Sequence, residues 1–125
     1  WWGSAGTTDS RLVTAKNYMP AVGQPVWVSA GNSGLQSGAV ANRFSTCEDG
    51  DPAVDLDLYS DSSVTGGDSG SPVAFSNTAT SRTDDVTAVG ILQCGAPGVP
   101  GAIAGYTRLE LMEGATNSTL VLSQP

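Results

Sequence analysis

The sequence predicts an all-β protein, a barrel or a sandwich made of one domain. Its 125 residues are a single-domain length, enough to bury a modest core. Sixteen glycines and seven prolines divide the chain into short apolar runs bounded by turn residues, which is the pattern of many short strands. No window shows a sustained helical periodicity, and no apolar run is long enough to span a membrane.

The strongest chemical signal is the segment Thr65-Gly66-Gly67-Asp68-Ser69-Gly70-Ser71-Pro72. Glycines allow the backbone to approach a substrate closely and to adopt angles that a Cβ would forbid. Ser69 would then be a nucleophile, and the backbone amides of Gly67 and Ser69 would converge as an oxyanion hole. The alternative interpretation is a plain turn between two strands, because these residue types dominate turns. The chain contains no histidine, so the sequence supplies no obvious general base for the serine.

Four further segments surround the serine motif. They are residues 26–40 (VWVSAG, then Gly34 and Gly-Ala-Val), 54–59 (VDLDLY), 88–95 (AVGILQCG) and 103–108 (IAGYTR). In this order, the segments and the motif resemble the C-terminal barrel of chymotrypsin-like (trypsin-fold) serine peptidases, especially bacterial secreted members. The resemblance covers residues 20–113. It implies an antiparallel Greek-key β-barrel over residues 20–125, preceded by a linker-like segment at residues 1–19.

In that family the triad runs His, Asp, Ser along the chain, with the first two on an N-terminal barrel. The resemblance therefore implies that this chain supplies Ser69 and the oxyanion hole of Gly67 and Ser69. The His and the triad Asp would come from a separate N-terminal barrel chain, produced by processing or by a split gene; a fragment of a longer protein is also open. Asp68 would be structural, with its carboxylate buried behind the loop and holding the oxyanion hole in shape.

The resemblance also implies a cleft for a polypeptide substrate. Gly95 and its strand would pair with the substrate backbone. Ser63, six residues before Ser69, would form the base of the specificity pocket, with Gly95 and Ala104 at its walls. None of the three carries charge, and the methyl group of Ala104 narrows the pocket. We therefore expect cleavage after uncharged apolar side chains of small to medium size.

Composition limits the other function classes. The formal net charge is −7, from 12 acidic and five basic residues, which argues against nucleic acid and against an anionic membrane surface as partners. An acidic surface suits a soluble, secreted protein. Four acidic residues, Asp49, Asp51, Asp55 and Asp57, lack the spacing of a calcium loop, and the last two would share a solvated strand face. We expect neither a metal nor a cofactor.

The competing function is a catalytically inactive peptidase-like barrel that serves as a structural or binding module. The retained serine motif argues against it, because a scaffold has no need for an oxyanion loop. Cys47 and Cys94 permit one disulfide, which would suit an oxidising compartment. A bridge between them, two buried thiols, and a thiol paired to a partner chain all stay open.

The remaining segments carry weaker expectations. The sequence predicts a short helical turn over residues 109–113 that stops at Gly114, and a final strand over residues 118–123. Residues 76–85 are polar and unpatterned, which predicts an exposed loop. Trp1 and Trp2 would pack against a neighbour or cover the open edge of the barrel itself.

Overall fold

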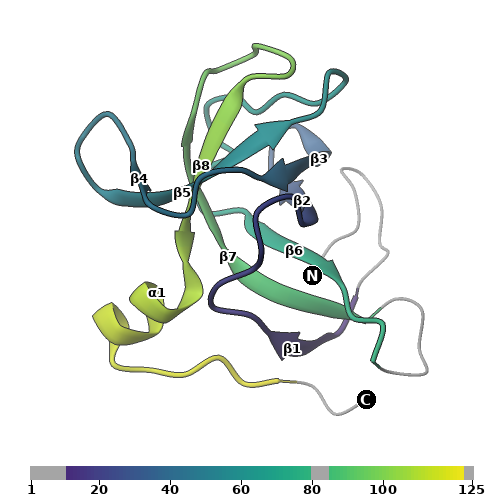
Figure 1. The fold of residues 1–125 in the computed structure, drawn as a ribbon, viewed down its shortest axis with the longest axis vertical. Helices are drawn as coiled ribbons and strands as arrows, with labels where there is room; N and C mark the ends of the chain where they lie inside the picture. The colour runs from purple at the N-terminus through teal and green to yellow at the C-terminus, as the bar shows by residue number, and fades with distance from the viewer. Residues whose placement is uncertain (1–10, 80–84, 123–125) are drawn as a thin grey trace.

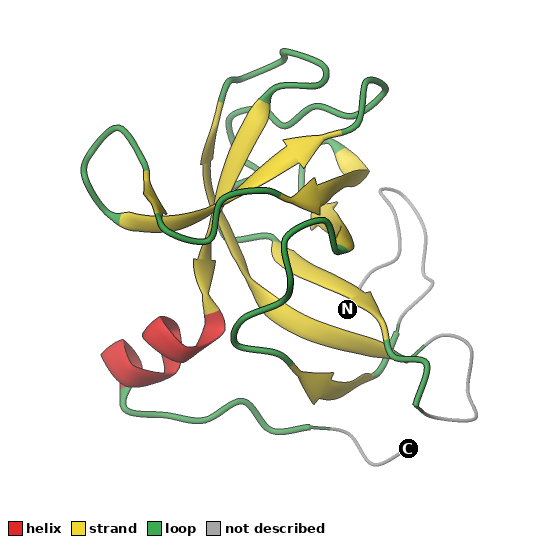
Figure 2. Cartoon of the chain, in the orientation of Figure 1, coloured by secondary structure: helices red, strands yellow, loops and turns green. Residues whose placement is uncertain are grey.

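The strands pair in an order that closes an antiparallel barrel (Figure 1). A computed structural model describes residues 11–79 and 85–122. The elements are β1 (Val13–Lys16), β2 (Pro25–Ala30), β3 (Gly34–Val40), β4 (Ser45–Thr46), β5 (Pro52–Leu58), β6 (Pro72–Ser76), β7 (Val86–Gly95), β8 (Ile103–Arg108) and α1 (Leu109–Thr116). Among these residues the ring runs β2-β3-β5-β8-β7-β6 and returns to β2, each pair antiparallel. The predicted all-β barrel with a short C-terminal helix is confirmed (Figure 2).

The order of the strands explains where the serine motif lies. Strand β5 pairs with β3 and β8, whereas the next strand in the chain, β6, pairs with β2 and β7. The chain must therefore cross from one side of the barrel to the other between residues 58 and 72. The serine motif lies on this crossing connection.

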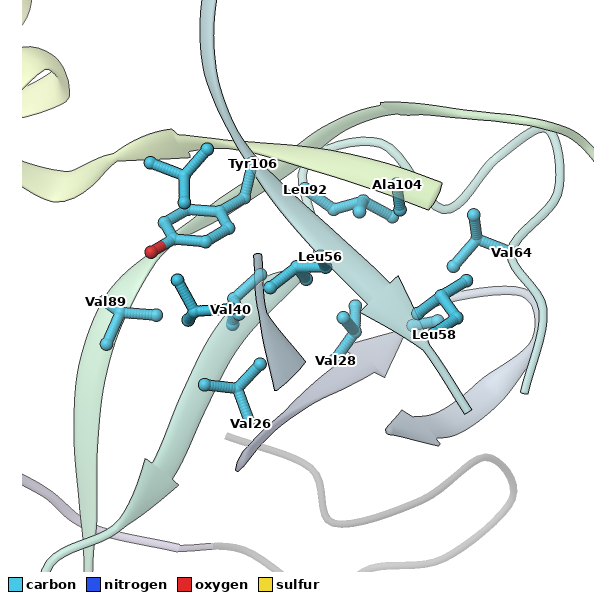
Figure 3. Packing of buried hydrophobic residues seen from close by; sticks show 13 residues of the cluster. Val26, Val28, Val40, Leu56, Leu58, Val64, Val89, Leu92, Ala104 and Tyr106 are labelled. Carbon is cyan, nitrogen blue, oxygen red and sulfur yellow. The ribbon is translucent and has the colours of Figure 1, made fainter. Parts of the chain in front are cut away.

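Alternation along the strands builds the core. In β2, the side chains of Val26, Val28 and Ala30 are buried, while the residues between them face outward. Figure 3 shows the cluster that fills the barrel, with the ring of Tyr106 directed into it. Each fully buried Val or Leu side chain contributes about 1.5–3 kcal/mol to the free energy of unfolding. Burial raises the pKa of Tyr106 to about 12, so its hydroxyl stays neutral.

A short strand lies within the segment predicted to be linker-like. Strand β1 pairs in parallel with β7, joining Val13 to Val86 and Lys16 to Ala88. Trp1 and Trp2 lie outside the described residues, as do residues 80–84 of the predicted loop. In the described part of that loop, Ser76 is the last residue of β6.

The C-terminal region differs from the prediction in two ways. Helix α1 passes through Gly114 and ends at Thr116. The capping residue Asn117 adopts the left-handed conformation with φ of 50°. A glycine inside a helix costs only about 0.5–1 kcal/mol, and Asn is well suited to the left-handed cap, so the predicted stop at Gly114 is wrong. The predicted strand at 118–123 is also wrong over its described residues, 118–122. There the backbone N–H of Leu120 donates to the Glu113 carboxylate at 2.6 Å, which turns the tail back onto the helix end.

The structure answers the cysteine question. Cys47 and Cys94 form a disulfide that ties the connection after β4 to strand β7. Asp55 and Asp57 alternate with buried residues along β5, so their side chains share the outer face. Within the described ranges, no group of His, Cys, Asp or Glu side chains could hold a metal ion, and no helix is long and apolar enough to cross a membrane.

Candidate active site

The crossing connection between β5 and β6 presents Ser69 at its tip. Gly67 and Gly70, on either side, have φ of 94° and 91°, a region that side chains with a Cβ rarely adopt. The loop is attached to β7 on one flank, because Gly70 N–H donates to the Leu92 carbonyl at 2.9 Å and Leu92 N–H donates to the Ser71 carbonyl at 2.8 Å. Ser69 itself is exposed.

Asp68, unlike the exposed Ser69 that follows it, is fully buried. Its Oδ1 accepts hydrogen bonds from the backbone N–H groups of Asn32 at 2.8 Å and Ser33 at 3.0 Å. Its Oδ2 accepts from the Ser33 hydroxyl at 2.5 Å and from the Thr65 N–H at 2.8 Å. Burial alone would raise the pKa of Asp68, but these four donors outweigh it and hold the pKa below its ordinary value. The carboxylate is therefore charged at neutral pH and fixes the shape of the loop.

The N–H groups of Gly66, Gly67 and Ser69 have no acceptor among the described residues. The sequence predicts the last two to be the oxyanion-hole donors. The amides around them are occupied: Asp68 N–H donates to Thr65, and Ser71 N–H donates to the Asp68 carbonyl, each at 3.1 Å. An amide without a protein acceptor, exposed beside a serine hydroxyl, is available to bind a developing oxyanion.

A cavity of about 210 Å³ opens beside the serine. Ser69 and Gly95 both line it, so the structure brings these two predicted residues together. The other lining residues are Val64, Thr65, Gly66, Leu92, Gln93, Cys94 and Pro97. None of the lining side chains carries a charge.

The other two predicted pocket residues, Ser63 and Ala104, do not line this cavity. The backbone N–H of Ser63 donates to the Gln36 side chain at 2.8 Å. Ala104 is buried behind Gly95, where a Cβ on Gly95 would come within 3.4 Å of it and within 2.9 Å of the Val64 side chain. Val64, the residue after Ser63, lines the cavity, and its side chain and that of Ala104 both lie against Gly95.

Ser69 has no general base beside its hydroxyl in the described part of the chain. Its Oγ makes one hydrogen bond there, a long contact of 3.4 Å to the backbone carbonyl of Gln93. The Gln93 side chain is held in turn: Nε2 donates to Asp51 at 3.1 Å, and Oε1 accepts from Thr107 at 2.6 Å. A backbone carbonyl cannot act as a general base, so the described residues place no base beside the Ser69 hydroxyl.

Sequence reasoning did not identify Asn32, Ser33 or Val64. The turn residues Asn32 and Ser33 have the composition of any hairpin turn. Val64 looks like another core valine. The role of Asn32 and Ser33 follows from the pairing of their turn with the serine loop (residues 65–72), which is more than thirty residues away in the sequence.

Two solved structures have the same fold as this chain. The chymotrypsin of Cellulomonas bogoriensis aligns with a TM-score of 0.66 and 17% sequence identity, covering 97% of this chain and 62% of that one. Protease A of Thermobifida fusca aligns with a TM-score of 0.72 and 19% identity, covering 96% of this chain and 60% of that one. No protein-family model and no curated protein matches the sequence. The fold is that of a chymotrypsin-like barrel, and the chain spans about three fifths of the length of each of these two structures.

Proposed function

We propose that this chain is the nucleophile-bearing barrel of a secreted serine endopeptidase. One observation carries the proposal: Ser69 stands exposed between two glycines of positive φ, beside two unoccupied amides and an uncharged cavity. A barrel of the same fold occurs in two bacterial proteins whose names are chymotrypsin and protease. The disulfide between Cys47 and Cys94 suits an oxidising, extracellular setting.

The proposed reaction is acyl transfer from a peptide bond to Ser69. The Oγ attacks the carbonyl carbon, and the carbonyl oxygen becomes an oxyanion that accepts hydrogen bonds from Gly67 and Ser69 N–H. The C–N bond then breaks, the amine leaves with a proton, and water hydrolyses the acyl-enzyme. The serine proton must go to a base and return to the leaving amine, and the sequence contains no histidine for this role.

We therefore propose a partner barrel that carries the histidine and its aspartate. Such a barrel would belong either to a separate chain or to the same polypeptide in a longer protein. The substrate backbone would lie along the end of β7 at Gly95, as an added strand. This arrangement would place the side chain before the cut in the cavity beside Ser69.

The cavity supports a preference for uncharged side chains. A buried Lys or Arg would find no carboxylate among the lining residues, and an unpaired buried charge is costly. Val64 and Ala104 fill the space behind Gly95, so the cavity favours apolar side chains of small to medium size.

The absence of histidine favours one other function, a catalytically inactive module that uses the same barrel for binding. A fluorophosphonate probe, which reacts only with an activated serine, separates the two proposals. The chain alone should not be labelled. Labelling should appear once the partner barrel is added. Intact mass and N-terminal sequencing of whatever co-purifies with the chain can identify that partner barrel.

Two variants complete this experiment. Ser69→Ala should abolish labelling of the two-barrel assembly, whereas Ser60→Ala, at an exposed serine outside the site, should leave it intact. An assembly that contains the histidine and is still not labelled would support the inactive module. Rapid labelling of the chain alone would show that Ser69 has a base other than the proposed histidine.

A further inference from the structure

The turn between β2 and β3 is bound to the serine loop through five hydrogen bonds. Residues 31–33 form this turn, which we call the clamp turn. Besides the three bonds from Asn32 and Ser33 to the Asp68 carboxylate, Gly31 N–H donates to Ser71 Oγ at 3.0 Å. The fifth bond runs from Asn32 Nδ2 to the Gly66 carbonyl at 3.2 Å. All five donors belong to the clamp turn, and the four acceptor atoms belong to the serine loop, with Asp68 Oδ1 accepting two of the bonds.

The bond from Asn32 to Gly66 controls the direction of an oxyanion-hole amide. The carbonyl of Gly66 and the N–H of Gly67 belong to one planar trans peptide unit, so they point in opposite directions. Holding the Gly66 oxygen against Asn32 Nδ2 therefore aims the Gly67 N–H away from the clamp turn. The side chain of Asn32 also packs closely on Gly67, where a Cβ would lie 3.6 Å from that of Asn32.

The bonds to Asp68 act on the second amide in the same way. The N–H of Ser69 belongs to the peptide unit that follows Asp68, so fixing the Asp68 side chain and backbone fixes that unit. The Ser33 hydroxyl is the one side-chain donor to the carboxylate, and the remaining three donors are backbone amides. No Lys or Arg of the described chain pairs with Asp68, so its charge is balanced by neutral donors alone.

We infer that Asn32 and Ser33 are positioning residues for the oxyanion hole: Asn32 orients the Gly67 amide directly, and Ser33 orients the Ser69 amide through Asp68. This inference rests on the proposed function for its catalytic meaning. It goes beyond that function because it assigns assembly of the hole to a hairpin turn of this same barrel. The hole would thus be shaped by the clamp turn, and no Lys or Arg side chain of the described residues takes part.

The direct test is NMR of the isotope-labelled chain, which requires no activity. Asn32→Ala removes the side-chain donor, and the isosteric Asn32→Asp replaces Nδ2 by an oxygen. In both variants the peptide unit between Gly66 and Gly67 loses its hydrogen bond from residue 32. We expect the residual dipolar coupling of the Gly67 N–H to change. In Ser33→Ala, a pH titration of the Asp68 carboxyl carbon should show a raised pKa, and Ser33→Thr, which keeps the hydroxyl, should restore it. Ser60→Ala is the matched control and should change neither signal, and spectral dispersion reports folding in every sample.

The kinetic test uses the two-barrel assembly. Loss of an oriented donor acts on the transition state, so Asn32→Ala should lower kcat by about 100-fold while KM stays nearly constant. If Asn32→Ala leaves both the Gly67 coupling and kcat unchanged, the inference for Asn32 is overturned. If Ser33→Ala leaves the Asp68 titration unchanged, the inference for Ser33 is overturned. If the assembly shows no hydrolysis that depends on Ser69, the proposed function fails. The NMR measurements, extended to the residual dipolar coupling of the Ser69 N–H in Ser33→Ala, still decide whether the clamp turn orients the two amides.

Discussion

Asp68 is a fully buried carboxylate whose four hydrogen-bond donors are all neutral groups. A buried charge is tolerated only when its hydrogen-bonding capacity is satisfied, and here both oxygens are satisfied twice. The same contacts that stabilise the charge also fix the loop that holds Ser69. Folding and the geometry of the site therefore depend on one side chain.

This dependence predicts an acid-sensitive stability. The pKa of Asp68 in the folded chain lies below its ordinary value of 3.8, so its contribution to stability is present above that value and is lost as the pH falls through the folded pKa. Asp68→Asn should lower the free energy of unfolding at pH 7 by about 1–3 kcal/mol, because an amide NH₂ then faces buried donors. The difference between wild type and variant should shrink at acid pH, as urea unfolding at a series of pH values would show.

Glu113 supplies the control for this experiment. Its pKa is also lowered, mainly by its hydrogen bond with the Tyr18 hydroxyl, so it titrates in the same direction. Glu113→Gln should leave the Asp68 contribution in place. Parallel pH curves for wild type and Asp68→Asn would contradict the prediction.

Val64 defines a second prediction on single residues. Its side chain lines the cavity and lies against Gly95, so Val64→Ala should deepen the pocket of the two-barrel assembly. A change of this size in a hydrophobic pocket is worth roughly 1–3 kcal/mol, so kcat/KM should rise about tenfold or more for larger apolar residues before the cut. A peptide-library profile measures this change.

Ser63→Ala is the neighbouring control for Val64. Ser63 does not line the cavity, and its contact with Gln36 uses the backbone N–H, which alanine retains. The profile should therefore stay the same in this variant. Dominant cleavage after Arg or Lys in the wild-type assembly would contradict the uncharged pocket.

At the scale of elements, the sequence predicts strands better than it predicts their ends and partners. Valines that alternate along β2, together with the glycine-bounded runs around the serine motif, are local signals, and the barrel follows from them and from the resemblance. The sequence predicts the end of α1 too early. A glycine at position 114 is tolerated inside the helix, and the helix stops only where Asn117 adopts the left-handed capping conformation. The clamp turn was not recognised, because its role depends on contacts with residues 66–71 that no local pattern encodes.

Two glycines in these elements give opposite predictions for the same substitution. Gly90 lies in β7 where a Cβ would come within 2.2 Å of the Thr107 carbonyl and 2.6 Å of the Tyr106 ring. Gly90→Ala should therefore break the pairing of β7 with β8 and destabilise the chain by about 1–3 kcal/mol or more. At Gly114, in α1, an added Cβ would meet no atom within 4 Å outside the backbone of the helix itself, so Gly114→Ala should stabilise the chain by about 0.5–1 kcal/mol. Denaturant unfolding of the two variants measures both effects, and a stabilised Gly90→Ala would show that β7 and β8 are not packed as described.

The whole molecule combines a closed barrel with a single disulfide, between Cys47 and Cys94. The disulfide joins residues 47 positions apart and connects the loop after β4 to the strand that lines the proposed cleft. Cys94 lies between Gln93 and Gly95, and its Sγ fills space that only a glycine at 105 leaves open, since a Cβ there would be 2.8 Å away. The bridge is therefore packed into the barrel wall beside the cleft.

Reduction of this bridge should lower the stability of the whole chain. Constraint of the unfolded chain by a disulfide is worth about 2–4 kcal/mol, and the 47-residue separation places this bridge among those that close a long loop. Unfolding with and without a reductant measures the loss, and Cys47→Ala with Cys94→Ala should reproduce it without one. Peptide mapping under non-reducing conditions should recover one linked pair. Two thiols that are freely alkylated in the unfolded, unreduced protein would contradict the bridge, and an unchanged unfolding curve after reduction would show that the barrel is held by its core and strand pairing alone.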